Sequence, residues 1–156
     1  MELVVVLGII AIVIVKVAGM SKPPEPNSTW SGTVSDSDII ESMRGDGSYS
    51  LNVVGESFYQ AQLDNICGGK KEEGHEHITT AKVIPYDSNT YDDHAVKVEI
   101  DNMTIGHLSR KDARRYRFKM GSKITICPAM ITGGWKRKDG RKVSEGHYGV
   151  RLDLEV

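Results

Sequence analysis

Six short segments of this chain alternate apolar and polar residues or are rich in β-branched residues, a pattern typical of half-buried β-strands. The clearest is at the C-terminal end, where Val150, Leu152, Leu154 and Val156 recur at every second position. The predicted strands are 50–54, 78–84, 95–101, 104–108, 123–132 and 147–156. Because short strands leave exposed edges unless the sheet closes, the pattern favours a small antiparallel barrel.

Two short helices are expected between these strands. The first covers 58–66 and ends at the glycine pair 68–69, since glycine commonly terminates a helix. The second begins with the capping box Ser109 to Asp112 and runs to about Met120. The sequence therefore predicts a mainly β domain with two short helices.

The front of the chain, residues 1–20, is expected to be a transmembrane anchor. Residues 3–15 are aliphatic with one glycine, and the apolar segment continues past Lys16 to Met20. At about 1.5 Å per residue, residues 3–20 reach about 27 Å, close to the ~30 Å of bilayer hydrocarbon. No basic residue precedes the segment, which favours an anchor over a cleaved signal peptide, the alternative that stays open.

The charges around this segment predict its orientation. Lys16 and Lys22 lie at its end and only Glu2 precedes it, so the rest of the chain is expected on the cytoplasmic side. The Pro- and Ser-rich stretch 21–48 is interpreted as a linker and 49–156 as the domain. A capping box at 35–38 predicts a further short helix over 39–43.

The net charge of −1 hides a strong polarisation along the chain. Positions 110–142 contain twelve Lys and Arg against two Asp. One basic cluster has Arg110, Arg114 and Arg117 spaced to share a helix face, and a second, 136–142, is expected in a loop. Two such clusters favour binding of a polyanion, and solvated basic surfaces are the alternative.

Four separated motifs are the least generic part of the chain. They are Gly55-Glu56-Ser57-Phe58-Tyr59, the run NTYDDHAV at 89–96, the run IGHLSR at 105–110, and Gly133-Gly134-Trp135 followed by GVRLDL at 149–154. Their order resembles a HIRAN domain over about 50–156. The resemblance implies an OB-like β-barrel that binds single-stranded DNA at a 3′ end and uses no cofactor. Hydrolase or zinc functions of helicase-fused relatives do not transfer, because this chain has no P-loop, helicase motif or RING cysteines.

The resemblance also implies roles for single residues. Phe58 and Tyr59 would stack on a base, and Tyr91 would form a second aromatic wall. Asp92 would accept a hydrogen bond from a terminal sugar hydroxyl. His107 and Arg110 would hold the terminal phosphodiester. The outer basic contacts would be Arg114, Arg117, Lys136, Arg137 and Lys138.

Two departures from the family pattern reduce what is expected of this site. Ser57 stands where animal members have a basic residue, which lowers the expected affinity. Thr90 replaces a proline, which lowers the expected rigidity of its loop. Ordinary structural roles also remain open: Phe58 at a strand-to-helix corner usually packs inward, Asp92 favours turns, and His107 is next to a helix cap.

Two other classes of function stay open. Asp92, Asp93 and His94 resemble a nuclease metal site, although neighbours on a strand point to opposite faces. Cys67 with the histidines at 75 and 77 offers a second metal-binding set, in a predicted loop. A protein-interaction scaffold at the membrane is the third class. Only two cysteines are present, which excludes a disulfide framework but not a single pair.

Overall fold

The structure is a computed structural model that describes residues 40–156. The expected anchor at 1–20 and most of the expected linker at 21–48 lie outside the described residues. Within 40–156, no helix is both long enough and apolar enough to cross a membrane.

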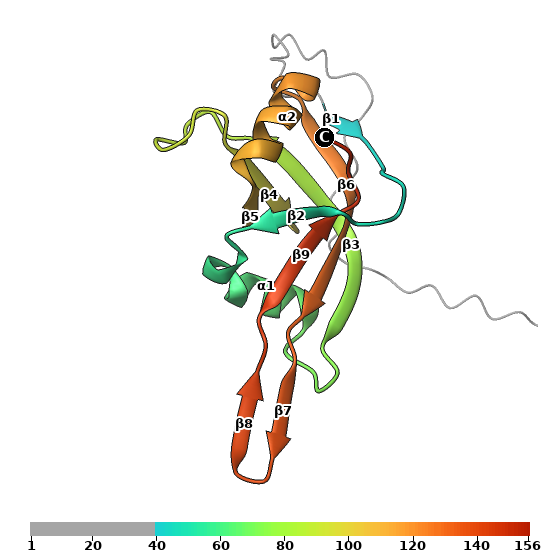
Figure 1. The fold of residues 1–156 in the computed structure, drawn as a ribbon, viewed down its shortest axis with the longest axis vertical. Coiled ribbons are helices and arrows are strands. Elements are labelled where there is room, and N and C mark those ends of the chain that lie inside the picture. The colour runs from blue at the N-terminus through green and yellow to red at the C-terminus, as the bar shows by residue number, and fades with distance from the viewer. Residues whose placement is uncertain (1–39) are drawn as a thin grey trace, which may run out of the picture. The chain divides into compact units, whose positions relative to one another are not determined.

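Six antiparallel strands close into a barrel in the order β6-β3-β4-β5-β2-β9, because β9 pairs back onto β6 (Figure 1). Their bounds are β2 (Leu51–Val54), β3 (His75–Pro85), β4 (Val96–Ile100), β5 (Met103–Leu108), β6 (Ile124–Gly133) and β9 (Tyr148–Leu152). Alternate residues of β2, β4 and β6 are buried inside the barrel. The mainly β barrel predicted from the sequence is confirmed, with all six strands present and their ends shifted.

A seventh strand, β1 (Ile40–Ser42), pairs in parallel with the start of β6. The helix predicted over 39–43 is therefore wrong for the residues that form β1. β9 pairs with β6 only from Ala129 onward, so the first residues of β6 have a free edge. β1 occupies this edge, and Met43 extends it by donating its backbone N–H to the carbonyl of Ile126 at 2.8 Å. Tertiary backbone pairing outweighs the local helix signal.

Both predicted helices inside the domain are confirmed. The first is a 3₁₀ turn, η2 (Glu56–Phe58), followed by α1 (Gln60–Cys67), and Gly55 permits this entry with a φ of 82°. The second is α2 (Arg110–Met120), which Ser109 caps by accepting a hydrogen bond from the N–H of Asp112 at 3.2 Å.

Tyr116 fixes α2 to the barrel. Its side chain is fully buried, and its hydroxyl lies 2.8 Å from both the carbonyl of Lys123 and the Oγ1 atom of Thr125, and 3.0 Å from the carbonyl of Val83. Burial raises the pKa of this hydroxyl, so it stays protonated and can donate. These contacts fix α2 to β3 and to the start of β6.

The second basic cluster forms a β-hairpin and not the loop expected from the sequence. β7 (Lys136–Asp139) pairs with β8 (Lys142–Glu145) in a separate two-stranded sheet that projects from one end of the barrel (Figure 1). Only Gly140 and Arg141 separate the strands, and Gly140 has a φ of 57°. A glycine with positive φ at the first turn position favours a two-residue hairpin turn. Gly140 therefore explains why this segment folds into a hairpin.

Candidate nucleic-acid interface

A shallow pocket of about 170 Å³ lies between the loop of residues 86–95, strand β5 and the first turns of α2. Its lining residues are Asn89, Tyr91, Asp92, Ala95, Val96, His107, Leu108 and Ala113. Three of the residues predicted to bind DNA, Tyr91, Asp92 and His107, thus line one pocket, and Arg110 reaches its edge through Asp92. The structure brings together motifs that lie apart in the sequence.

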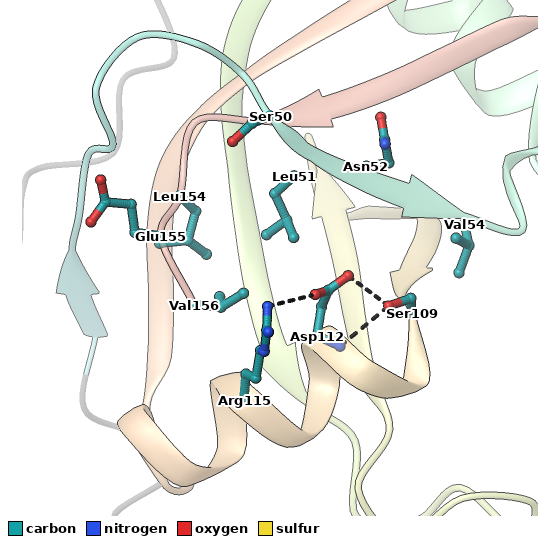
Figure 2. Close-up of a pocket in the computed structure, with 10 residues that line it drawn as sticks. All are labelled: Ser50, Leu51, Asn52, Val54, Ser109, Asp112, Arg115, Leu154, Glu155 and Val156. Carbon is teal, nitrogen blue, oxygen red and sulfur yellow. Dashed lines mark hydrogen bonds and ion pairs between the residues drawn. The ribbon is translucent and has the colours of Figure 1, made fainter.

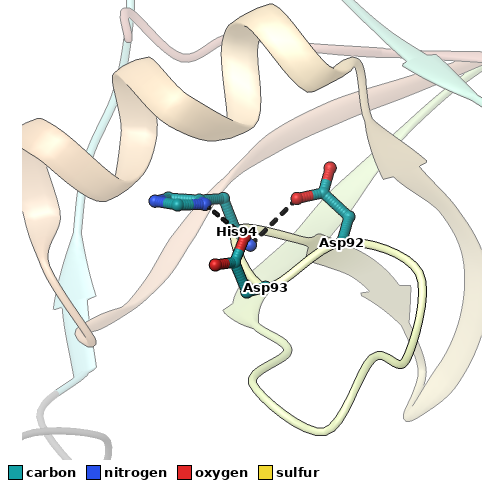
Figure 3. A group of neighbouring side chains, drawn as sticks. All are labelled: Asp92, Asp93 and His94. Carbon is teal, nitrogen blue, oxygen red and sulfur yellow. Dashed lines mark hydrogen bonds and ion pairs between the residues drawn. The ribbon is translucent and has the colours of Figure 1, made fainter.

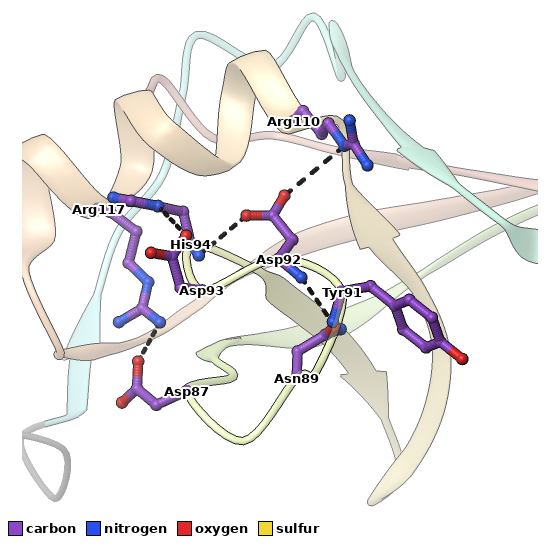
Figure 4. A network of polar contacts seen from close by, with 8 residues as sticks. All are labelled: Asp87, Asn89, Tyr91, Asp92, Asp93, His94, Arg110 and Arg117. Carbon is purple, nitrogen blue, oxygen red and sulfur yellow. Dashed lines mark hydrogen bonds and ion pairs between the residues drawn. The ribbon is translucent and has the colours of Figure 1, made fainter.

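Side-chain hydrogen bonds to the backbone order the 86–95 loop (Figure 4). The Oδ1 atom of Asn89 accepts from the N–H of Tyr91 at 2.8 Å and from that of Asp92 at 3.2 Å. Asp92 then accepts from the N–H of His94 at 3.0 Å. The loop thus has internal hydrogen bonds although Thr90 stands in place of a proline.

Two of the three predicted stacking residues are open to solvent. Phe58 is 85% exposed and Tyr91 is 92% exposed. The alternative that Phe58 packs into the core is wrong, because Phe58 ends the η2 turn and Leu63 of α1 is buried in the core. Tyr59 is half-buried, and the centre of its ring lies 6.3 Å from that of His107. Tyr59 and Tyr91 thus lie near His107, and the side chains of Phe58 and Tyr91 are open to solvent.

His107 is held in place by the glycine before it. A Cβ atom on Gly106 would lie 2.4 Å from the Cγ1 atom of Val53 and 2.8 Å from the carbonyl oxygen of Val54, so β5 approaches β2 this closely only with glycine. The pKa of His107 is lowered chiefly by burial and also by the positive charge of Lys97. His107 is therefore neutral near pH 7 and offers a hydrogen bond, not a positive charge.

Of the two residues predicted to hold the terminal phosphodiester, Arg110 is more exposed than His107. Its side chain is 79% exposed, and its Nε atom lies 3.9 Å from the Oδ2 atom of Asp92. It also begins α2, where the first backbone N–H groups have no acceptor within the helix and the helix dipole favours anions. This corner therefore places positive charge beside the pocket.

The basic face of α2 is largely matched by acidic residues of the 86–95 loop (Figure 4). Arg117 forms an ion pair with Asp87 and its side chain is only 12% exposed. The pKa of Asp93 is lowered, chiefly by the hydrogen bond to His94 and also by the charge of Arg114. Arg117 thus holds the loop, and its role as an outer DNA contact stays a prediction.

The basic residues of the hairpin do not join this face. Lys136, Arg137 and Lys138 lie on β7, at the end of the barrel opposite to α2 (Figure 1). The two clusters that appear as one basic segment in the sequence are therefore two separate surfaces.

The predicted metal ligands of the 86–95 loop do converge, but next to cations. Asp92, Asp93 and His94 place one ligand atom each within 4.8 Å of one another (Figure 3). They lie in a turn and not on a strand, so the argument that their side chains diverge is wrong. The guanidinium groups of Arg110 and Arg114 act on the same carboxylates, which opposes binding of a divalent cation.

The second predicted metal set does not form such a group within residues 40–156. His75 begins β3, and its Nε2 atom lies 2.8 Å from the carbonyl oxygen of Gly69. Cys67 and Cys127 are free thiols, which answers the question of pairing left open by the sequence.

Sequence reasoning missed a larger pocket on the other side of the first turns of α2 (Figure 2). It measures about 640 Å³ and lies between β2, α2 and the C-terminal segment. The carboxylate of Asp112 lines this pocket, accepts a hydrogen bond from Ser109 and lies 3.9 Å from the Nη1 atom of Arg115. Glu155 contributes a second carboxylate to the lining. Two carboxylates against one arginine make this pocket unsuited to a phosphate chain.

Comparison with known protein families, with curated proteins and with solved structures finds no match to this chain.

Proposed function

We propose that this barrel is a HIRAN-type module that binds single-stranded DNA at a 3′ end, and that residues 3–20 tether it to the cytoplasmic face of a membrane. The observation that carries the DNA-binding proposal is the convergence of the 86–95 loop, His107 and Arg110 around one pocket. The sequence alone associates these residues only through resemblance to a family.

The size of the pocket supports a polymer end as the ligand. At about 170 Å³ it is smaller than the ~300–1,000 Å³ of typical small-molecule sites. A pocket of this size suits one terminal group of a longer ligand, and the rest of that ligand must then run over the surface. The exposed rings of Phe58 and Tyr91 provide flat apolar faces there, and base stacking on such rings contributes about 1–3 kcal/mol per base.

The polar groups of the site suit a sugar-phosphate end. Arg110 and the start of α2 offer charge and N–H donors to a phosphate. The carboxylate of Asp92 has oxygen atoms that can accept from a terminal hydroxyl, and neutral His107 can take part in a hydrogen bond. In this proposal each of these groups assists binding.

The deciding experiment titrates the full chain with labelled single strands of one sequence that carry a free 3′ hydroxyl, a 3′ phosphate or no end because they are circular. The free 3′ end is expected to bind at least about tenfold more tightly than the circle. Binding should weaken with salt, with a slope of about −0.7 for each phosphate contacted. Equal affinity for all three strands would contradict end recognition.

Two further measurements test the remaining parts of the proposal. Cleavage of the same strands when magnesium or manganese is added would favour the nuclease alternative. Digestion of the domain by protease added outside sealed cells or right-side-out vesicles would contradict the cytoplasmic orientation.

A further inference from the structure

The β7–β8 hairpin is a free ribbon at the end of the barrel opposite to α2 (Figure 1). Every residue of Lys136–Asp139 and of Lys142–Glu145 is exposed. At about 3.4 Å per residue, each strand is about 14 Å long, and the two strands lie about 4.8 Å apart. The ribbon is thus a narrow, two-faced projection.

Contacts at the base of the ribbon fix it to the domain. The Oε2 atom of Glu145 accepts from the Nζ atom of Lys70 at 2.6 Å, and its Oε1 atom lies 2.9 Å from the Nζ atom of Lys136. These two lysines lower the pKa of Glu145 to about 2. The guanidinium of Arg137 lies 5.1 Å above the centre of the Trp135 ring. The domain therefore determines where the ribbon points.

The outer half of the ribbon has three cations that make no ion pair with any residue in 40–156: Lys138, Arg141 and Lys142. Lys138 pairs across the hairpin with Val143, and Asp139 pairs with Lys142. Because successive side chains of a strand point to opposite faces, Lys138 and Lys142 lie on opposite faces of the ribbon. Arg141 lies in the turn between the strands.

We propose that this ribbon binds in the major groove of double-stranded DNA. That groove is about 12 Å wide and admits a two-stranded β-ribbon. A ribbon that enters this groove edge-on has one phosphate backbone opposite each of its two faces. This arrangement matches a cation on each face and a third cation at the tip. The inference goes beyond binding of 3′ ends, because the ribbon and the pocket are separate surfaces.

An anionic membrane is the competing partner for a basic projection. A flat lipid surface meets one face of a ribbon, so it favours cations and apolar side chains gathered on that face. Lys138 shares a face with Val143, but Lys142 lies on the opposite face, so a flat surface meets only one of these two cations. Val143 is the only apolar side chain of the ribbon and is 50% exposed. Duplex DNA therefore fits the arrangement better.

The test uses the full chain and a covalently closed DNA dumbbell, which has a duplex and no 3′ end, with binding followed by fluorescence anisotropy. A triple variant, Lys138→Gln, Arg141→Gln and Lys142→Gln, is expected to weaken binding at least about tenfold at moderate salt. The slope of log Kd against log salt should fall by about 2 to 3, near 0.9 for each lost phosphate contact. The three side chains are exposed and unpaired within 40–156, and circular dichroism checks that the variant is folded.

The matched control removes the same charge from α2 through Lys111→Gln, Arg115→Gln and Lys119→Gln. It is expected to bind the dumbbell as the unmodified chain does. An equal loss in this control would assign the effect to net charge and overturn the inference. Failure of the unmodified chain to bind the dumbbell would also overturn it.

Two parallel titrations distinguish the remaining outcomes. The full chain is also titrated with vesicles of phosphatidylcholine alone and with vesicles that contain phosphatidylglycerol as well, so that any contribution of residues 3–20 is common to both. If the ribbon variant loses a preference for the anionic vesicles but keeps the dumbbell, the partner is a membrane and the duplex inference is wrong. Titration with linear single strands separates the two proposals. Preference for free 3′ ends without dumbbell binding removes only the ribbon inference, whereas the reverse removes only end recognition.

Discussion

The Nε atom of Arg110 lies 3.9 Å from the Oδ2 atom of Asp92 and connects the first turn of α2 to the 86–95 loop (Figure 4). The arginine side chain is 79% exposed and the aspartate 19%. An ion pair this open to water contributes about 0–1 kcal/mol to stability. Arg110 can therefore turn from Asp92 to a phosphate without loosening the fold.

Replacing Arg110 is expected to affect binding and not stability. Arg110→Ala should weaken binding of a single-stranded 3′ end by about 10- to 100-fold, because a charge-assisted hydrogen bond to phosphate contributes about 1.5–3 kcal/mol. The matched control is Arg115→Ala, since Arg115 lies on the same helix at 3.9 Å from Asp112. Equal losses in both variants would indicate a diffuse basic surface.

Replacing Tyr91 tests base stacking. Tyr91→Ala should weaken binding of single strands by about 5- to 150-fold, the equivalent of about 1–3 kcal/mol for one stacked base. Phe118→Ala is the control, because Phe118 is 94% exposed on α2 and Tyr91 is 92% exposed. Melting temperatures of both variants should stay close to that of the unmodified chain. An unchanged affinity for Tyr91→Ala would remove the stacking role.

Replacing Arg117 is expected to lower stability. Its Nε atom is buried and without a hydrogen-bond partner in the described part of the chain, and its side chain is paired with Asp87. Arg117→Ala should reduce the free energy of unfolding in urea by about 1–3 kcal/mol, since it frees the 86–95 loop and removes buried packing. Arg114→Ala, an exposed change on the same helix, should stay within about 0.5 kcal/mol. Similar losses in both would contradict the loop-holding role.

His107 should make stability depend on pH. Burial first and Lys97 second lower its pKa from the usual 6.5, so the unfolded chain takes up this proton more readily than the folded one. The free energy of unfolding should therefore fall as the pH drops below about 6.5 and level off below the folded pKa. Urea titrations from about pH 8 to about pH 5 should show a smaller fall in His107→Gln than in His147→Gln. The same pH dependence in both variants would argue against this assignment.

The two thiols should react slowly in the folded protein. Burial raises the pKa of Cys127 to about 12 and also raises that of Cys67. Because the thiolate is the reactive form, a thiol reagent near pH 8 should label Cys67 slowly and Cys127 only on unfolding. The variant Cys67→Ser identifies which signal belongs to which residue. Fewer than two reactive thiols in denaturant would contradict the free state of both cysteines.

Much of the barrel is predictable because its signals are local. Burial alternates along β2 and β4 as the sequence alternates, since a strand has a side-chain period of two. The start of α2 is predictable because its cap lies within one turn. The hydroxyl of Ser109 accepts from the N–H of Asp112 and donates to the carboxylate of Asp112. β1 is not predictable in this way, since its hydrogen bonds go to β6, far along the chain.

The candidate site divides along the same line. Resemblance to a family predicted that Tyr91, His107 and Arg110 belong to one site. Tyr91 and His107 line the same pocket, and Arg110 lies at its edge beside Asp92. No local pattern could show that Arg117 forms an ion pair with Asp87, 30 positions earlier in the chain. The exposure of Phe58 was also hidden, because an aromatic residue after a strand usually packs inward, whereas here Leu63 of α1 is in the core and Phe58 is not.

The sequence by itself determined the six strands of the barrel, the two helices and the concentration of positive charge between 110 and 142. Only the tertiary structure decided how that charge is used. Closure of the barrel directs α2 and the β7–β8 hairpin to opposite ends, so one basic segment becomes two surfaces (Figure 1). The physical reason is that periodicity and capping act within one or two turns, whereas charge pairing and exposure depend on which distant strand lies next to each residue.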